Sequence, residues 1–171
     1  TPSTEDLAFG LAALNLLVDS WSTDQAFISA EQSGLFTLVT GTQSYTIGSG
    51  GAFNVARPIK IDRAVLSVTD PGATSTGKLK LPVDLINFDE FAALNPRTLA
   101  GTTPTKLYSD HAQPLTTLYL WPIPTFTTNT PQLELFYWVP VPSFAALATV
   151  VTLAPGYERA LKFALALEMV P

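Results

Sequence analysis

Long runs of apolar residues at helical spacing lie near the two ends of the chain. This placement of the helices, more than any other feature, limits what the chain can fold into. Near the start, Ser3 or Thr4 can cap a helix whose first turn holds Glu5 and Asp6, which the positive end of the helix dipole favours. The apolar residues of this helix follow at steps of four, three, four and three: Leu7, Leu11, Leu14, Val18 and Trp21. The spacing predicts a helix to about residue 22, with one apolar stripe that needs a packing partner.

A second helix is predicted at the other end, where Pro155 suits the first helical position. One side of this helix carries Tyr157, Ala160, Leu161, Ala164, Leu165 and Glu168, and another side carries Phe163, Leu167 and Val170. A helix that is apolar nearly all round needs burial on more than one side. Either another subunit or chain beyond Pro171 can supply that additional cover.

Between the helices, from residue 27 to residue 153, the pattern changes to short alternating runs typical of strands. The expected strands span residues 35–40, 44–47, 58–69, 78–81, 105–109, 115–121 and 132–139. The first two strands form a hairpin around Gly41, and residues 70–72 form a turn. We expect 115–121 to pair antiparallel with 132–139 through the loop 122–131, with Leu118 and Leu120 buried. One short helix is expected at residues 83–94, ended by Asn95 and Pro96.

These patterns predict an α+β fold. The discontinuous segments 1–26 and 154–171 form a two-helix core, and residues 27–153 form a large inserted antiparallel β-sandwich or barrel-like domain. Each terminal helix has an apolar face without a local partner, so the two are expected to pack together. The residues expected in this helical core are Leu7, Leu11, Leu14, Val18, Trp21, Leu161 and Leu165.

Charged residues are scarce. They make up 13% of the chain against 47% apolar residues, and the formal net charge is −5. A generic nucleic-acid binder needs a basic surface, which this balance does not provide. No stretch approaches the ~18 uncharged apolar residues of a membrane helix, so no membrane partner is expected. So few charges indicate either burial against other copies or partners, or a neutral surface rich in threonine.

The sequence contains no arrangement typical of catalysis or metal binding. It has no cysteine and a single histidine, His111, which excludes thiolate sites and multi-histidine metal sites. Asp84, Asp89 and Glu90 cluster on a predicted helix surface with no facing acid, which favours a solvated face over a glycosidase pair. Adjacent residues of an extended segment point to opposite faces, so Asp110 and His111 do not form a dyad. We expect a non-enzyme without cofactor or metal.

Two further groups of residues are candidates for binding. Arg57, Lys60 and Arg63 form a small basic run that can contact DNA if the three share a face. Asp62 interrupts the run, and the overall charge opposes such a contact. Four aromatic residues of the expected strands can stack on sugars or serve as core or interface residues: Tyr119, Trp121, Tyr137 and Trp138.

The order of short motifs along the chain carries more information than any one of them. The motifs are LNLLVDSW at 14–21, FTLVTGTQSYTIG at 36–48, RPIKI at 57–61, LYLWP at 118–122, LELFYW at 133–138 and LAPGYERAL at 153–161. This ordered set resembles the head-to-tail adaptor proteins of tailed bacteriophages, which are related to the packaged-DNA stabilisation or tail accessory factor proteins of short-tailed phages. The resemblance covers nearly the whole chain.

The resemblance implies a structural protein of the virion neck that is made in the host bacterial cytoplasm. Such proteins assemble as a ring, commonly of twelve copies, below the portal protein. They extend the channel, retain packaged double-stranded DNA without sequence-specific binding, and dock tail or nozzle proteins. The resemblance also implies another helix before Thr1 and more chain after Pro171. In such a ring, the closing helix is expected to place Tyr157, Phe163 and Leu167 at a subunit or portal interface, with Arg159 at its rim.

Two other functions stay open. A β-sandwich module that binds a receptor or carbohydrate, on a phage or bacterial surface, would explain the threonine-rich turns, the aromatic strands and the loop at 72–77. It would not explain helices at both ends. A hydrolytic enzyme would need a paired-acid pocket.

Overall fold

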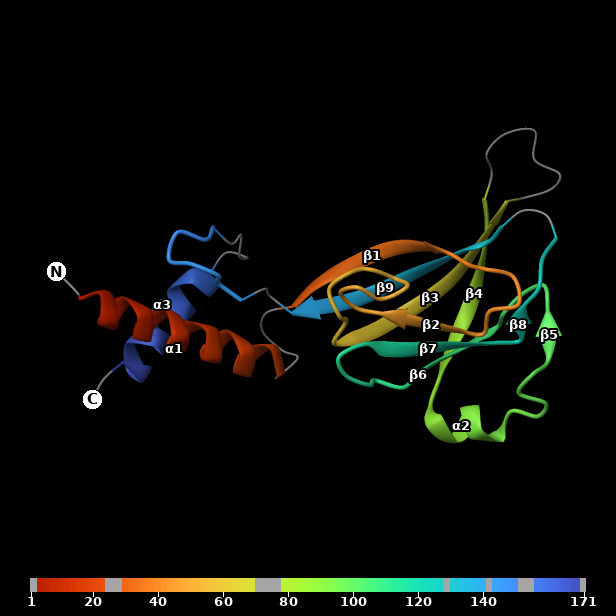
Figure 1. Cartoon of the computed structure of the whole chain (residues 1–171), viewed down its shortest axis with the longest axis horizontal. Coiled ribbons are helices and arrows are strands. Elements are labelled where there is room, and N and C mark those ends of the chain that lie inside the picture. Colours follow the sequence, from red (N-terminus) through yellow and green to blue (C-terminus); the bar gives the residue numbers. More distant parts are fainter. Residues whose placement is uncertain are drawn as a thin grey trace. The chain divides into compact units, whose positions relative to one another are not determined.

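The computed structural model of the chain describes residues 3–23, 29–69, 78–127, 130–140, 143–150 and 156–169. The chain divides into two compact units, one made of Thr1–Ala30 with Pro140–Pro171 and the other of Glu31–Val139. The first is helical and the second is built mainly of strands (Figure 1). The domain boundaries expected at 26/27 and 153/154 lie outside the described residues, as do Pro155, Val170, the turn at 70–72 and the loop at 72–77.

The first helix of the helical unit, α1 (Thr4–Thr23), begins at a cap made by Ser3 and Asp6. The Asp6 backbone N–H donates to Ser3 Oγ at 3.1 Å. The Asp6 carboxylate accepts from the Ser3 backbone N–H at 2.9 Å and from the Ser3 hydroxyl at 2.8 Å. These bonds to Ser3 hold the pKa of Asp6 below its usual value. The reciprocal cap satisfies backbone donors that the first turn of a helix leaves without partners.

The second helix of this unit, α3 (Tyr157–Glu168), packs against α1. Leu17, Val18 and Leu161 are buried at the contact. Partly buried residues surround this cluster: Leu14, Trp21, Phe144, Tyr157, Ala164 and Leu165. The contact therefore uses the C-terminal half of α1, and it includes Leu17, which lies beside the expected stripe. Leu7, at the other end of that stripe, is exposed.

The strand-built unit contains a curled sheet of seven strands, in the order β1-β9-β3-β4-β6-β7-β2 (Figure 1). The strands are β1 (Ser29–Thr37), β2 (Ser44–Ile47), β3 (Lys60–Thr69), β4 (Lys78–Ile86), β6 (Lys106–Ser109), β7 (Thr116–Trp121) and β9 (Gln132–Pro140). A second, two-stranded sheet pairs β5 (Ala100–Gly101) with β8 (Ile123–Pro124). The chain is thus a mixed α+β protein with one large curled sheet.

Strict alternation along the strands forms the core of this unit. Every second residue of β7 and of β9 is buried, so one face of the curled sheet is apolar and enclosed. Leu118 and Leu120 are fully buried, as predicted. The other fully buried large side chains are Leu38, Ile47, Leu66, Leu107, Leu133, Leu135, Pro104 and Pro124. Burying each such leucine contributes about 1.5–3 kcal/mol.

The expected pairing of residues 115–121 with 132–139 is wrong. Strand β7 lies between β6 and β2, whereas β9 lies beside β3, with Leu66 opposite Leu133. The connection between β7 and β9 is not a simple hairpin loop, because its backbone N–H groups donate hydrogen bonds to residues 99 and 101. Ile123 N–H donates to Leu99 O and Thr125 N–H donates to Gly101 O. Alternation identifies the buried face of a strand, but it does not identify the neighbouring strand.

The hairpin expected from 35–40 and 44–47 is also wrong, because β1 and β2 lie at opposite ends of the strand order. The turn at Gly41 is present, and its φ of 74° is a left-handed conformation that glycine adopts easily. Backbone N–H groups of this connection bond across the unit: Leu38 donates to Pro131 O and Gly41 donates to Pro124 O. Strand β2 pairs instead with β7, with Tyr45 opposite Leu118.

The expected helix at 83–94 is shorter and begins later, at α2 (Phe88–Ala93). Strand β4 continues through Val83, which is buried, to Ile86. Asn87 then caps α2 through a reciprocal capping box with Glu90. The expectation of a purely antiparallel domain is wrong as well, because β4 and β6 pair parallel and β5 and β8 pair parallel. A parallel pair needs a crossover, and α2 with the following segment provides the one between β4 and β6.

Candidate functional site

The outward side of α3 carries the main candidate interface residues. Phe163 is 61% exposed and Leu167 is 76% exposed. They lie one helical turn apart, on the side of α3 away from the buried Leu161. The Arg159 guanidinium lies over the Phe163 ring, 5.5 Å from the ring centroid. We name Arg159, Phe163 and Leu167 the outer stripe of α3. Tyr157, which the sequence analysis groups with them, packs instead against the cluster between α1 and α3.

A comparable surface on α1 was missed by the sequence analysis. Phe9 is 61% exposed and Leu16 is 69% exposed. Two full turns separate them, and a rotation of about 100° per residue places both on the side of α1 away from Leu14 and Trp21. Glu5 lies one turn before Phe9, and Ala12 lies between Phe9 and Leu16; both are exposed. We name Glu5, Phe9, Ala12 and Leu16 the outer stripe of α1. The sequence does contain this pattern, because Phe9 and Leu16 are apolar and seven residues apart, which places them on one side of a helix beside the first stripe.

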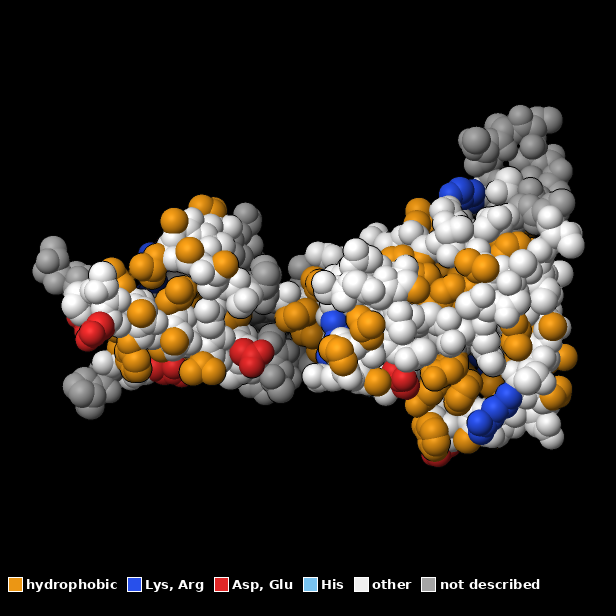
Figure 2. All heavy atoms as spheres, in the orientation of Figure 1, with side chains coloured by type: hydrophobic (Ala, Val, Ile, Leu, Met, Phe, Trp, Pro, Cys, Tyr) orange, Lys and Arg blue, Asp and Glu red, His pale blue; other side chains and the backbone are white. Residues whose placement is uncertain are grey.

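An apolar groove of about 440 Å³ also opens on the helical unit. Its walls come from α1, from residues 143–150 and from the end of α3. Its apolar lining residues are Leu7, Gly10, Leu11, Leu14, Phe144, Ala146, Leu147, Leu165 and Met169. The expected core residues Leu7 and Leu11 therefore line a groove instead of the α1–α3 contact. Hydrophobic side chains spread over the visible face of the helical unit in Figure 2.

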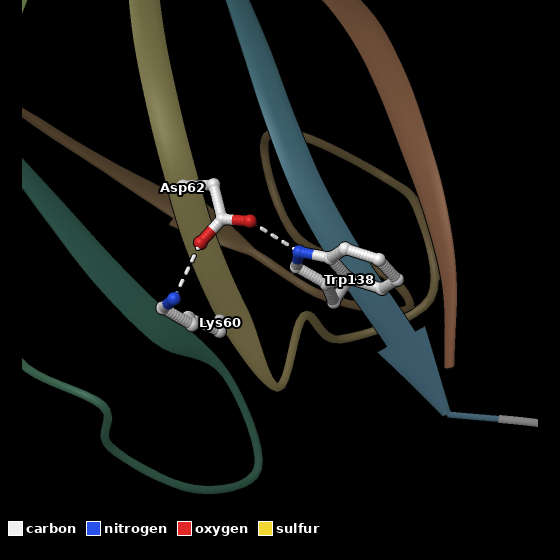
Figure 3. A network of polar contacts seen from close by, with 3 residues as sticks. All are labelled: Lys60, Asp62 and Trp138. Carbon is white, nitrogen blue, oxygen red and sulfur yellow. Dashed lines mark hydrogen bonds and ion pairs between the residues drawn. The ribbon is translucent and has the colours of Figure 1, made fainter. Parts of the chain in front are cut away.

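Each of the three cations proposed for DNA contact has a partner within its own unit. Lys60 Nζ lies 2.6 Å from Asp62 Oδ1, and the other oxygen of Asp62 accepts a hydrogen bond from the Trp138 indole N–H (Figure 3). The bonds from Lys60 and Trp138 hold the pKa of Asp62 below its usual value. Arg63 lies over the Phe136 ring at 4.0 Å, and Arg57 donates to the His111 carbonyl at 3.0 Å. These partners compete with any phosphate.

A cluster of aromatic rings covers the outer face of the sheet beside α2. Phe91 stacks on Tyr108 with ring centroids 4.5 Å apart, and it also contacts Tyr119 at 5.3 Å. Phe88 contacts Tyr108 and is largely exposed. The Arg97 guanidinium lies 5.3 Å from the Phe91 centroid. Hydrophobic side chains gather over α2 in Figure 2, with Lys or Arg side chains beside them.

The four aromatic residues considered for sugar stacking do not share one face. Tyr119 and Trp121 point to the outer face of β7, and the Trp121 indole N–H donates to Pro96 O at 3.0 Å. Tyr137 is buried in the core, where burial raises its pKa, whereas Trp138 lies on the opposite face of β9. A sugar platform needs adjacent exposed rings, and these four do not provide one.

Two of the acidic residues considered for catalysis, Glu90 and Asp110, have structural roles, and Asp84 lies on strand β4 instead of on the expected helix. Glu90 completes the cap of α2. Asp110 Oδ1 accepts from the backbone N–H groups of Ala112 at 3.0 Å and Thr117 at 2.7 Å. Burial opposes ionisation of Asp110, but these hydrogen bonds outweigh it and lower its pKa. In the described part of the chain, no three His, Cys, Asp or Glu side chains gather in a way that could hold a metal ion.

The helices of the described residues include none that is long and apolar enough to span a membrane. The model of one protein family, described as SU10 adaptor protein, matches residues 3–169. This match includes both compact units. No curated protein matches the chain.

Proposed function

Since the chain belongs to the SU10 adaptor protein family, which makes it a bacteriophage adaptor of the virion neck, we propose that it forms a ring below the portal protein. The ring contains one kind of subunit, with twelve copies as the expected number. It extends the channel through which double-stranded DNA passes, helps to retain that DNA, and offers a docking surface to tail or nozzle proteins. The role is structural and requires no catalysis, cofactor or metal.

The observation that supports ring formation best is the outer stripe of α3. Phe163 and Leu167 are large, apolar and more than half exposed on a helix whose other side is already packed. Leaving such side chains in water forgoes about 1.5–3 kcal/mol each, which a neighbouring subunit can recover by covering them. The two-helix unit is thus the proposed adaptor core, and this stripe is its proposed subunit or portal interface.

The electrostatics support a channel that does not hold DNA tightly. The formal net charge of the chain is −5. Lys60 is paired with Asp62, Arg63 lies on Phe136 and Arg57 bonds to the main chain, so these cations are engaged within the subunit. Tight DNA binding needs several cations free to replace counterions on neighbouring phosphates. A lumen without them lets the duplex slide.

The alternative, a receptor- or carbohydrate-binding module, finds less support. The aromatic residues that would bind the sugar lie on two faces of the sheet, and Tyr108, Tyr119 and Phe91 already contact one another.

The decisive experiment for the adaptor function is deletion of the gene for this protein from the phage that encodes it. Particles without the protein should package DNA but lose it and fail to attach tails. Particles that keep their DNA and attach tails normally would refute the adaptor function and favour the recognition module.

A further inference from the structure

Strands β3 and β4 are neighbours along only part of their length. They pair from Ala64 opposite Val83 to Thr69 opposite Lys78. Before Ala64, β3 pairs with β9 alone, and after Val83, β4 pairs parallel with β6 instead of with β3. The ribbons of β3 and β4 diverge from this point, and β4 continues to α2 (Figure 1). Residues 60–63 of β3 and 84–86 of β4 therefore each have a described strand on one side only.

A cleft of about 430 Å³ opens where the two strands part, and we name it the β3–β4 cleft. Its apolar walls include Ile61 of β3, Leu85 and Ile86 of β4, and Leu107 of β6. Val83 and Leu85 point to the same face of β4, because side chains alternate along a strand. Val83 is 4% exposed, whereas Leu85 is 39% exposed. The inner face of the sheet thus becomes accessible where β3 leaves β4.

The polar lining of the β3–β4 cleft favours an acidic ligand. Lys60 and His111 belong to this lining, whereas no Asp or Glu does among the described residues. Lys60 is paired with Asp62, yet its side chain stays 58% exposed. Ser109 also lines the cleft, and its buried Oγ, which can donate, has no hydrogen-bond partner in the described structure. In a chain with a formal net charge of −5, this lining is the complement of a carboxylate.

The strand edges beside the cleft fit an extended peptide. Backbone N–H and C=O groups along an edge without a neighbouring strand can bond to an added strand. Residues 60–63 span about 13 Å, which matches a segment of about four residues. Side chains of such a segment alternate, so every second one faces the apolar walls and the others face the rim at Lys60. The cleft therefore selects a segment in which apolar and acidic residues alternate.

We propose that the β3–β4 cleft binds an extended, acidic segment of a tail or nozzle protein by strand addition. Apolar side chains of this segment lie between Ile61 and Leu85, and a carboxylate lies at Lys60. The inference rests on the proposed adaptor function and names the chemistry of its tail contact. The helical unit holds the proposed subunit or portal interface, which leaves the strand-built unit for the tail. A peptide carboxylate needs one cation, whereas tight DNA binding needs several.

A synthetic peptide tests the ligand chemistry. The probe is a short fluorescent peptide of alternating valine and glutamate, and fluorescence anisotropy measures its binding to the full-length protein. The matching peptide of valine and lysine should bind about tenfold more weakly, because it brings cations to Lys60. A glutamate peptide N-methylated at every second residue lacks the backbone donors of one edge and should also bind weakly. Equal binding of the three peptides, or no binding of the probe at millimolar concentration, would overturn the proposal.

Two pairs of variants locate the binding. Lys60→Glu reverses the charge at the rim and should weaken probe binding about tenfold, whereas Lys78→Glu, at an exposed lysine of β4 outside the cleft, should not. Leu85→Phe should fill the cleft and have a similar effect, with Leu79→Phe on the same strand as its control. Urea unfolding of the leucine variants should match the wild type, which excludes unfolding as the cause. Equal losses of binding in Leu85→Phe and Leu79→Phe would contradict a site in the cleft.

Hydrogen exchange tests the strand addition itself. With the probe bound, exchange measured by mass spectrometry should slow in residues 60–63 and 84–86, whose free edges take the added strand. It should stay unchanged in residues 64–67, which already pair with β4 on one side and β9 on the other. Binding without slower exchange at 60–63 and 84–86 would overturn strand addition.

Phage particles separate this inference from the adaptor function on which it rests. Particles that carry Leu85→Phe should contain the protein and keep their DNA but fail to attach tails, whereas Leu79→Phe particles should attach tails normally. Normal tails on Leu85→Phe particles would overturn the cleft as the tail contact and leave the adaptor function standing. Deletion of the gene without any effect on DNA retention or tails would refute both.

Discussion

The side chain of Asn15 and the main chain of Phe144 exchange two hydrogen bonds, although 129 positions separate them in the sequence. Asn15 Nδ2 donates to Phe144 O at 3.1 Å, and Phe144 N–H donates to Asn15 Oδ1 at 2.7 Å. The amide of Asn15 thus replaces a backbone partner for a segment that belongs to neither a helix nor a strand. This pair ties residues 143–150 to α1 and places Phe144 against the α1–α3 cluster.

Replacing Asn15 by Ala should release this segment. The change leaves one N–H and one carbonyl without partners, which costs about 1–3 kcal/mol where they are partly buried. Hydrogen exchange measured by mass spectrometry should become faster in residues 143–150 while exchange in β7 is unchanged. Ser20→Ala, which removes a local bond to Leu17 O in the same helix, is the control. Unchanged exchange at 143–150 would show that the apolar contacts of Phe144 are sufficient.

The core of the strand-built unit should respond strongly to truncation of Leu120. This residue is fully buried on β7, opposite Leu107 on β6, so Leu120→Ala leaves a cavity. We expect a loss of about 2–5 kcal/mol in the free energy of unfolding of this unit, measured with urea. Leu79→Ala on the exposed side of β4 should change that free energy by less than about 1 kcal/mol. Similar losses for both would contradict the assigned buried face.

Asp110 should make the strand-built unit sensitive to acid. Its folded pKa lies below the usual value of 3.8, so its carboxylate stabilises the fold above that pH and loses this contribution as the pH falls through the folded pKa. Asp110→Asn keeps Oδ1 as an acceptor and removes the charge. The wild type should be more stable than this variant at pH 7, by about 1 kcal/mol. The difference should shrink below pH 3.8, in urea titrations at a series of pH values. A constant difference down to pH 2 would contradict this role.

The Lys60–Asp62–Trp138 network should limit DNA binding. Removing the carboxylate with Asp62→Ala frees Lys60 and removes a negative charge beside Arg63. The variant should bind double-stranded DNA more tightly than the wild type in fluorescence anisotropy, with a steeper dependence on salt. Its stability should fall by less than about 1 kcal/mol, because the pair is at the surface. Wild-type binding that is already tight and is lost in Lys60→Ala would indicate a true DNA contact.

Local patterns identified which residues are buried in the strands but not which strands are neighbours. Leu118 and Leu120 were predicted to be buried because alternation alone decides this. The pairing of β7 with β2 and of β9 with β3 depends on contacts between residues far apart in the sequence, such as Tyr45 with Leu118. The helix was expected from residue 83, although Asn87 and Glu90 have the spacing of a capping box that places its first residue at Phe88.

The helices show the same division. The spacing of Val18 and Trp21 on α1 and of Leu161 on α3 places apolar side chains where the two helices pack. It does not show that Leu7 stays exposed, because that depends on where α3 crosses α1. The outer stripe of α1 was missed because only the stronger stripe from Leu7 to Trp21 was considered on this helix. The exposure of Phe9 and Leu16 follows from the packing of α3 against the other side of α1.

The mass of the assembled full-length protein, measured by native mass spectrometry alone and bound to its portal, tests the central claim most directly. The account predicts one closed oligomer of a single subunit count, expected to be twelve, that binds the portal as a unit. A monomer at all concentrations that also fails to bind the portal would contradict it.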